Sequence, residues 1–160
     1  MDLFYLFTKK FDCETSPGYT KQHKAGRFII EYASSKYYNI ENPELVIINK
    51  KPKFKYSDIQ FSISHCRDIV CVCFDKDPVG FDIEEIRPRN FTAIAERMNF
   101  KLKENSLEEF YKNWTMYEAE IKLQMPVKSR YCTNFLDKYI ISAVSSKADN
   151  IRLNYIEIKL

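Results

Sequence analysis

Two carboxylates, two residues apart in an apolar stretch, could bind a hard divalent cation. Residues 79–84 (V-G-F-D-I-E) alternate as in a β-strand, where successive side chains point to opposite faces. Asp82 and Glu84 therefore share one face with Gly80, and the apolar residues between them should enter the core. Carboxylate oxygens are ligands that Mg²⁺ prefers, and glycine leaves room for a bulky group to approach. The strand thus predicts a metal site beside Gly80.

A glutamate and a lysine on one face of a predicted helix could complete such a site. Glu118 and Lys122 are four residues apart, so they share a helical face. The helix should begin at the capping-box pattern Ser106 to Glu109 and end before Pro126. Its buried stripe is expected at Leu107, Phe110, Trp114, Tyr117 and Ile121. Taken alone, Glu118 and Lys122 would be an ordinary ion pair worth about 0.3–0.5 kcal/mol.

Basic and hydroxyl side chains in the first half of the chain could bind phosphate groups. A helix expected over residues 20–37 carries Lys24 and Arg27, three residues apart, beside its buried stripe. That stripe is expected at Ala25, Phe28, Ile29, Tyr32 and Ala33. Ser64 and His65 come at the end of a later apolar strand, in its connection to the next one. Taken alone, Lys24 and Arg27 are better explained as solvent-exposed basic side chains, and a lone histidine after a strand is usually structural; a phosphate site is the alternative.

Three segments, in this order, resemble the signature of the 4′-phosphopantetheinyl transferase superfamily. They are residues 61–65 (F-S-I-S-H), residues 79–84 (V-G-F-D-I-E) and residues 114–122, which read W-T-x-x-E-A-x-x-K. The likeness is greater to the single-chain Sfp-type branch than to the short trimeric synthases. It implies a cytoplasmic enzyme that uses Mg²⁺ to move the 4′-phosphopantetheine arm of coenzyme A to a serine of an apo carrier protein, releasing 3′,5′-ADP. The carrier would serve fatty-acid, polyketide or nonribosomal peptide synthesis.

The same resemblance implies an α+β fold of two similar α/β halves about a pseudo-twofold axis, with the active site between them. The turn at residues 75–78 is the expected boundary, which gives an N-terminal half over residues 1–77 and a C-terminal half over residues 78–160. The C-terminal half would carry the metal-binding motifs.

The motif positions also carry implied roles. Asp82, Glu84 and Glu118 would bind Mg²⁺, and Glu118 would accept the proton of the carrier serine. Lys122 would contact the phosphates of coenzyme A.

Five residues would bind coenzyme A itself. Arg27 would meet the 3′-phosphate, with Lys24 as its companion. Lys51, in a turn that resembles the family's G-K-P turn, would touch the nucleotide or its phosphates. Ser64 and His65 would bind the pyrophosphate.

The chain departs from the family pattern at three positions. Tyr117 stands where the family usually has a lysine, so a basic group near the phosphates is missing. Lys50 replaces the glycine of the G-K-P turn, and Cys66 stands where a second serine often follows the histidine.

Composition narrows the class of protein. The chain has 160 residues with a net charge of +3, which is too balanced to predict nucleic-acid binding. There is no secretory signal and no apolar run approaching ~18 residues, so no membrane association is expected. The five cysteines should be free thiols in the cytoplasm, with Cys71 and Cys73 as core residues rather than metal ligands. A monomer is expected.

The remaining elements follow from periodicity and turn residues. Strands are expected over residues 3–7, 45–48, 59–63, 69–74, 79–84, 131–135, 139–144 and 151–158, a short helix over 91–98, and turns at 16–18 and 50–53.

Two other functions remain open at this stage. Asp82 with Glu120 and Lys122 matches the D…E-x-K pattern of metal-dependent nucleases, but that pattern needs its E-x-K on a strand, and here it lies in a predicted helix. A non-catalytic module of the same fold, which binds coenzyme A or a carrier protein without transfer, is favoured by Tyr117 and the short chain.

Overall fold

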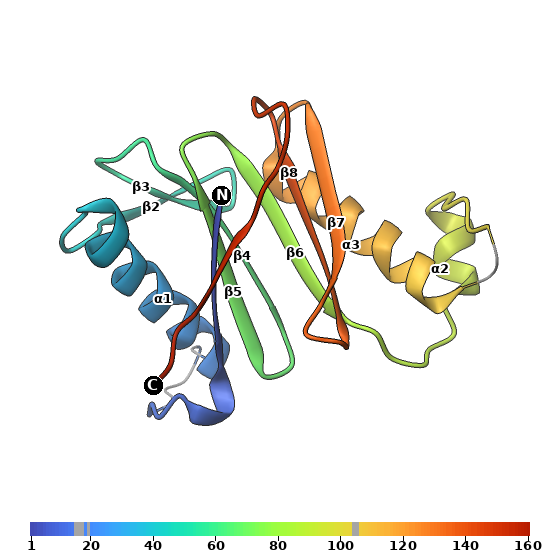
Figure 1. The fold of residues 1–160 in the computed structure, drawn as a ribbon, viewed down its shortest axis with the longest axis horizontal. Helices are drawn as coiled ribbons and strands as arrows, with labels where there is room; N and C mark the ends of the chain where they lie inside the picture. Colours follow the sequence, from blue (N-terminus) through green and yellow to red (C-terminus); the bar gives the residue numbers. More distant parts are fainter. Residues whose placement is uncertain (15–17, 19, 104–105) are drawn as a thin grey trace.

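A computed structural model describes residues 1–14, 18, 20–103 and 106–160. The chain forms an α+β fold with layers in the order helix, sheet, sheet, helix (Figure 1). The expected turn at residues 16–18 lies mostly outside the described residues. No helix in the described part of the chain is both long and apolar enough to cross a membrane.

The first sheet has four strands in the order β4-β5-β1-β9. They are β1 (Asp2–Phe7), β4 (Gln60–Cys66), β5 (Ile69–Asp75) and β9 (Asn154–Glu157). β1, β4 and β5 pair antiparallel, whereas β9 returns from the end of the chain to pair in parallel with β1. In Figure 1 this last segment runs across β1. A short 3₁₀ helix, Thr8–Lys10, which the sequence did not predict, follows β1.

Helix α1 (Lys21–Tyr38) covers the outer face of this sheet. Thr20 caps its N-terminus, because its hydroxyl accepts from the His23 N–H while the His23 ring accepts from the Thr20 N–H. Apolar residues of α1 pack on alternate residues of β1 and β5: Ala25, Ile29, Ile30 and Ala33 on Phe4, Leu6, Val70, Val72 and Phe74. Phe28 and Tyr32, expected in the buried stripe, lie at its edge and are only partly buried.

A separate hairpin extends from α1 towards the second half of the chain. It consists of β2 (Leu45–Ile48) and β3 (Lys51–Phe54), joined at Asn49 and Lys50. Both turn residues have positive φ angles, 51° and 65°, as two-residue hairpin turns require. The turn predicted over residues 50–53 is therefore wrong beyond Lys50, because the next residues already pair as a strand. Lys50 adopts the left-handed region that favours glycine.

The second sheet is antiparallel in the order β6-β8-β7. Its strands are β6 (Val79–Glu85), β7 (Ser129–Phe135) and β8 (Tyr139–Ser145). One face of this sheet packs against the first sheet. Its Val79, Phe81 and Ile83 share a core cluster with Leu3 of β1 and with Ile69, Cys71 and Cys73 of β5. The prediction that the apolar residues of β6 enter the core is confirmed, and both cysteines are buried free thiols.

Helix α3 (Leu107–Leu123) covers the other face of β6 and β8. It contacts β6 very closely: a Cβ placed on Gly80 would lie 2.0 Å from the Ala119 carbonyl oxygen and 2.8 Å from the Leu123 nitrogen. The room beside Gly80 is thus filled by the helix backbone. A short helix, α2 (Thr92–Arg97), packs with the first turns of α3.

The buried stripe predicted for α3 is wrong in the C-terminal half of the helix. Its buried residues are Phe110, Tyr111, Thr115, Ala119 and Leu123, whereas Tyr117 and Ile121 are 37% and 49% exposed. Two small side chains, Thr115 and Ala119, face the sheet because Gly80 admits a close approach of the helix. The Thr115 hydroxyl forms a hydrogen bond of 2.8 Å with the Ser142 hydroxyl of β8. Large apolar residues are therefore displaced to the surface of the helix.

The two sheets meet where β4 lies beside β6. No backbone ladder joins these two strands among the described residues. Small polar side chains of β4 bond β6 instead: the Phe81 N–H donates to Ser62 Oγ at 3.0 Å, and the Glu85 N–H donates to Cys66 Sγ at 3.3 Å. The division at residues 77 and 78 and the pseudo-twofold relation of the halves stay predictions.

Candidate active site

Asp82 lies at the centre of the candidate site, in the middle of β6, and only 5% of it is exposed. Its Oδ1 accepts two hydrogen bonds of 2.7 Å, one from Ser64 Oγ on β4 and one from Lys122 Nζ on α3. Its Oδ2 is buried and has no hydrogen-bond partner. Buried acceptors are normally satisfied, so this oxygen is free to bind a further donor or a cation.

Residues from all three matched segments therefore meet at one carboxylate. Ser64 comes from residues 61–65, Asp82 from residues 79–84 and Lys122 from residues 114–122. Lys122 is in the last turn of α3, and its side chain is 29% exposed. Its ammonium balances the charge of Asp82 while still reaching the surface.

Glu118 is one turn before Lys122 on α3. Partial burial and then the negative charge of Asp82 raise the pKa of Glu118, against a smaller opposite effect of Lys122. Because the charges of both Asp82 and Lys122 contribute to this shift, Glu118 lies within electrostatic reach of the two.

Glu84 is two residues beyond Asp82 on β6. Burial and the charge of Asp82 raise the pKa of Glu84. Burial also raises the pKa of the Cys66 thiol to about 11, so the thiol stays protonated at neutral pH and donates to Glu84 Oε2 at 3.5 Å. Cys66, which the sequence singled out only as a departure from the family pattern, is thus a direct partner of a predicted metal ligand.

The donor set suits a hard cation such as Mg²⁺. Within the described ranges, no three His, Cys, Asp or Glu side chains are gathered closely enough to bind a metal ion. However, Asp82 offers a buried oxygen without a partner, and Glu84 and Glu118 both have raised pKa values in its field. Carboxylates in this condition gain most from a divalent ion. The assignment of Asp82, Glu84 and Glu118 as ligands stays a proposal.

His65 is not in a connection, as the sequence predicted, but inside β4, where it pairs with Val70. Because side chains alternate along a strand, His65 points to the opposite face from Ser64 and is exposed. Partial burial and the nearby charges of His23 and Lys122 lower the pKa of His65. Ser64 therefore contacts Asp82, and His65 borders the surface beside α1.

Lys51 links the β2–β3 hairpin to β6. Its Nζ donates to the Val79 carbonyl at 2.7 Å. Burial, then repulsion from Lys53 and Lys122, lowers the pKa of Lys51 to about 8. Together with Lys122 it lines a hollow of about 350 Å³ between the hairpin, β4 and the end of α3.

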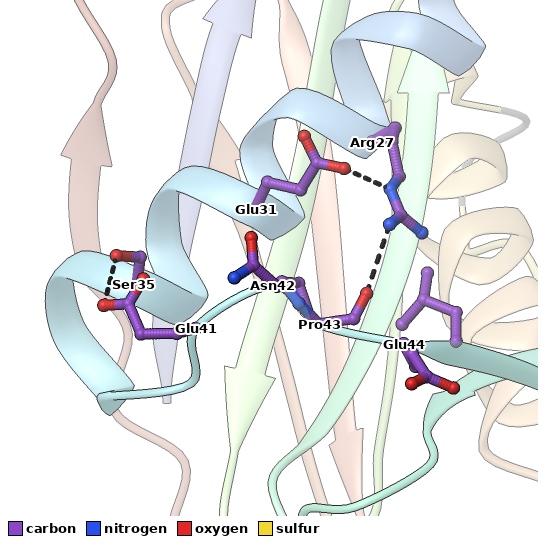
Figure 2. Close-up of a pocket in the computed structure, with 8 residues that line it drawn as sticks. Arg27, Glu31, Ser35, Glu41, Asn42, Pro43 and Glu44 are labelled. Carbon is purple, nitrogen blue, oxygen red and sulfur yellow. Dashed lines mark hydrogen bonds and ion pairs between the residues drawn. The ribbon is translucent and has the colours of Figure 1, made fainter.

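Arg27 and Lys24 lie on the exposed side of α1, away from Asp82. Arg27 donates through Nε to Glu31 Oε1 at 2.5 Å and through Nη2 to the Pro43 carbonyl at 3.1 Å, as Figure 2 shows. Lys24 Nζ donates to the carbonyl of Glu14. Glu31 is a partner that sequence reasoning missed, although its spacing of four residues from Arg27 on a helix could have indicated it.

One surface nevertheless connects the two groups of basic residues. A hollow of about 650 Å³ is lined by His23, Lys24 and Arg27, and it shares Pro52 and Ile63 with the hollow that contains Lys51 and Lys122. Together we call the two hollows the α1–α3 groove. Lys24 and Arg27 lie at one end, beside Glu31, and Lys51 and Lys122 lie at the other. Basic side chains at both ends suit a ligand that carries phosphate groups.

The nuclease interpretation does not match this geometry. Glu120 and Lys122 lie on α3 rather than on a strand, and Glu120 forms an ion pair with Arg130 at 2.6 Å. The glutamate of the E-x-K pattern is therefore paired with Arg130 on β7, whereas the nuclease pattern would need it beside Asp82 at a shared metal site.

Comparison with known proteins points to one class of enzyme. A Haemophilus influenzae protein whose name places it among the 4′-phosphopantetheinyl transferases is 38% identical over 86 residues, which cover 46% of this chain and 37% of that protein. The Bacillus subtilis 4′-phosphopantetheinyl transferase ffp is 36% identical over 83 residues, covering 43% and 37%. The Bacillus subtilis (strain 168) transferase Sfp is 34% identical over 86 residues, covering 45% and 38%. The chain thus matches less than two fifths of the length of these relatives. No family model matches the chain.

Proposed function

We propose that this chain is a 4′-phosphopantetheinyl transferase, which transfers the 4′-phosphopantetheine arm of coenzyme A to a serine of an apo carrier protein. Its similarity over 83–86 residues to three proteins of that name supports the proposal. The observation that carries this proposal is the cluster of Ser64, Asp82 and Lys122, in which side chains from three separate matched segments bond one carboxylate. Such a convergence is what a site built by those segments requires.

Coenzyme A is proposed to bind along the α1–α3 groove. Its 3′-phosphate would meet Arg27 and Lys24 at one end, and its pyrophosphate would lie near Lys122 at the other. His65, which is exposed on β4 within electrostatic reach of Lys122, would contact the same pyrophosphate. Arginine and lysine suit these positions because they form charge-assisted hydrogen bonds with phosphate oxygens. The Lys51 ammonium, already held by Val79, would add positive charge near the same end of the groove.

Asp82, Glu84 and Glu118 would hold Mg²⁺. When bound, the ion supplies charge neutralisation of the pyrophosphate and of the leaving group. Two observations support Asp82 as a ligand of the ion. Its Oδ2 is buried without a hydrogen-bond partner, and the hydrogen bond from Ser64 to Oδ1 holds the carboxylate in place.

The transfer itself requires one proton acceptor. The carrier serine Oγ would form a bond to the β-phosphorus, the bond to the 3′,5′-ADP oxygen would break, and Glu118 would take the serine proton. The raised pKa of Glu118 suits this role, because a base works best when its pKa is nearer to the working pH. Lys122 would donate to the phosphate oxygens as charge develops.

We also propose that the reaction takes place in the cytoplasm. All five cysteines are free thiols in the structure, which fits a reducing cytoplasm. We propose that the carrier protein serves fatty-acid, polyketide or peptide synthesis. We also propose that the enzyme acts as a monomer and that neither nucleic acid nor membrane is among its partners.

The proposal can be tested with purified components. Apo carrier protein is incubated with this protein, coenzyme A and Mg²⁺, and its mass is measured while coenzyme A binding is measured in parallel. We expect a mass gain of one phosphopantetheine arm, with 3′,5′-ADP released in equal amount. Binding of coenzyme A without a mass gain on any of the three carrier types would instead support a non-catalytic module.

A further inference from the structure

Arg27 is engaged by a carboxylate of its own helix before any ligand arrives. We propose that Glu31 determines specificity in the α1–α3 groove, because it competes with a phosphate for Arg27 and so weakens the preference for ligands that carry a 3′-phosphate. This inference rests on the proposed function through the assignment of Arg27 to the 3′-phosphate of coenzyme A.

The contacts of Arg27 leave it only partly available. A guanidinium has five N–H donors, and two of them are used by Glu31 at 2.5 Å and by the Pro43 carbonyl at 3.1 Å. Both partners approach the same edge of the guanidinium, from α1 and from the segment before β2 (Figure 2). A phosphate can bind the remaining donors, but it must then share Arg27 with the Glu31 carboxylate.

Three carboxylates line the hollow of about 620 Å³ beside Arg27, namely Glu31, Glu41 and Glu44. Of these three carboxylates, Glu31 is the one for which the described part of the chain shows an ion pair with Arg27. Glu41 accepts from the Ser35 hydroxyl at 2.9 Å, and Glu44 forms an ion pair with Lys55 at 2.9 Å. Glu44 therefore provides a control with the same charge in the same hollow but without the contact.

Glu31 could also strengthen phosphate binding by holding Arg27 in a suitable orientation. Competition for Arg27 would weaken the affinity for a 3′-phosphate, whereas orientation would increase it. The side chains of Arg27 and Glu31 are 47% and 50% exposed. An exposed ion pair of this kind orders its partners weakly. A phosphate monoester dianion that shares Arg27 with a carboxylate experiences direct like-charge repulsion at short range. We therefore infer that competition outweighs orientation.

The test compares two nucleotides that differ only in the 3′-phosphate. Calorimetric titration gives the dissociation constants of 3′,5′-ADP and 5′-AMP for the wild-type protein, Glu31→Gln and Glu44→Gln, at one fixed low ionic strength. Glu31→Gln should increase the preference for 3′,5′-ADP by roughly 3- to 10-fold, mainly through tighter binding of 3′,5′-ADP. Glu44→Gln should leave the preference within about twofold, because exposed charges that make no direct contact with the ligand are largely screened.

Three results would overturn the inference. Equal preference in Glu31→Gln and wild type would show that the carboxylate does not compete. A reduced preference in Glu31→Gln, repeated in Glu31→Ala, would show that Glu31 orients Arg27 for the phosphate. If the wild-type protein binds neither nucleotide, the α1–α3 groove is not a nucleotide site and the inference fails. The titrations contain no carrier protein, so the transfer assay decides the proposed function independently of all three.

Discussion

At the scale of single residues, Asp82 has the most asymmetric surroundings in the site. One carboxylate oxygen accepts from both Ser64 and Lys122, whereas the other is buried without a partner. Leaving a buried acceptor unpaired costs about 1–3 kcal/mol. Such a cost is expected where a site is completed by a bound ion or ligand.

Lys51 should make stability depend on pH in the alkaline range. Its pKa is lowered from 10.5 to about 8 in the folded protein. Between these values the unfolded chain holds a proton that the folded protein has lost, so the free energy of unfolding should rise as the pH increases from about 8 to 10.5. Allowing for partial solvent screening, we expect about 1–2 kcal/mol.

Urea unfolding under reducing conditions measures this effect. Wild-type protein and Lys51→Met are compared at several pH values across the window, and the difference between them should shift in favour of wild type as the pH rises. A constant difference would show that the lysine retains its ordinary pKa in the folded protein. A difference that moves in favour of Lys51→Met would show that folding raises this pKa; either result contradicts the prediction.

Tyr117 should tolerate replacement by the lysine that its family pattern favours. Its side chain is 37% exposed, and its ring only borders those of Phe100 and Trp114, at centroid distances of 6.4 and 6.2 Å. Tyr117→Lys should therefore cost no more than about 1 kcal/mol of stability. A lysine stem can extend along the helix surface to bring its ammonium near the phosphates, so we expect faster transfer.

Melting temperature and transfer rate, measured on the same preparation, check this prediction. Tyr117→Met serves as the control, because it provides a long side chain without charge and should not accelerate transfer. A stable Tyr117→Lys protein with an unchanged rate would show that the missing lysine does not limit catalysis.

At the scale of elements, the contact between α3 and β6 sets the relative position of the side chains in the candidate site. Gly80 lets the backbone of α3 approach β6, and this approach brings Lys122 to Asp82. Gly80 has no unusual φ angle, so the requirement is one of space alone.

A matched pair of glycine substitutions tests this requirement. Gly80→Ala would place a methyl group 2.0 Å from the Ala119 carbonyl oxygen, so we expect at least about 1–3 kcal/mol of destabilisation from overpacking, together with reduced transfer. Gly26→Ala in α1 meets only ordinary contacts of 3.7 and 3.8 Å with Ile63 and Val70. It should gain helix propensity of up to about 1 kcal/mol. Thermal unfolding of both variants gives the comparison, and a Gly80→Ala protein as stable as Gly26→Ala would contradict it.

Local patterns predicted most elements well. The alternation in β6 placed Val79, Phe81 and Ile83 in the core, and the Ser106 cap and periodicity defined α3. The buried face of α3 could not be predicted in the same way, because large apolar residues were expected inside. Which face of a helix is buried depends on its partner, and here Gly80 on β6 favours the face that carries Thr115 and Ala119.

The turn at Asn49 and Lys50 shows a similar limit. The sequence after Ile48 indicated a turn, but a two-residue hairpin places Lys51 in a strand and aims its side chain at β6. Turn type determines register, and two consecutive non-glycine residues with positive φ are an uncommon solution that residue preferences do not indicate.

At the scale of the whole molecule, side-chain hydrogen bonds join the two larger sheets where β4 lies beside β6, and no backbone ladder joins these strands among the described residues. Ser62, Ser64 and Cys66 alternate along β4, and each bonds a residue of β6. β9 adds a second connection by pairing with β1. Neither connection could be predicted from the sequence, because both depend on which distant segments become neighbours, whereas the resemblance to a known family did predict that the three motifs meet.

The most direct test of the central claim combines transfer with the residue at which the motifs meet. Wild-type protein, Asp82→Asn and Glu120→Gln are each incubated with apo carrier protein, coenzyme A and Mg²⁺, and the mass of the carrier is followed over time. Glu120→Gln is the control, since Glu120 on the same helix pairs with Arg130 instead of with the site. We predict that wild type and Glu120→Gln add one phosphopantetheine arm at similar rates, and that Asp82→Asn remains folded but is slower by on the order of 10²-fold or more. A carrier left unmodified by wild-type protein, or modified equally fast by a folded Asp82→Asn protein, would contradict the account.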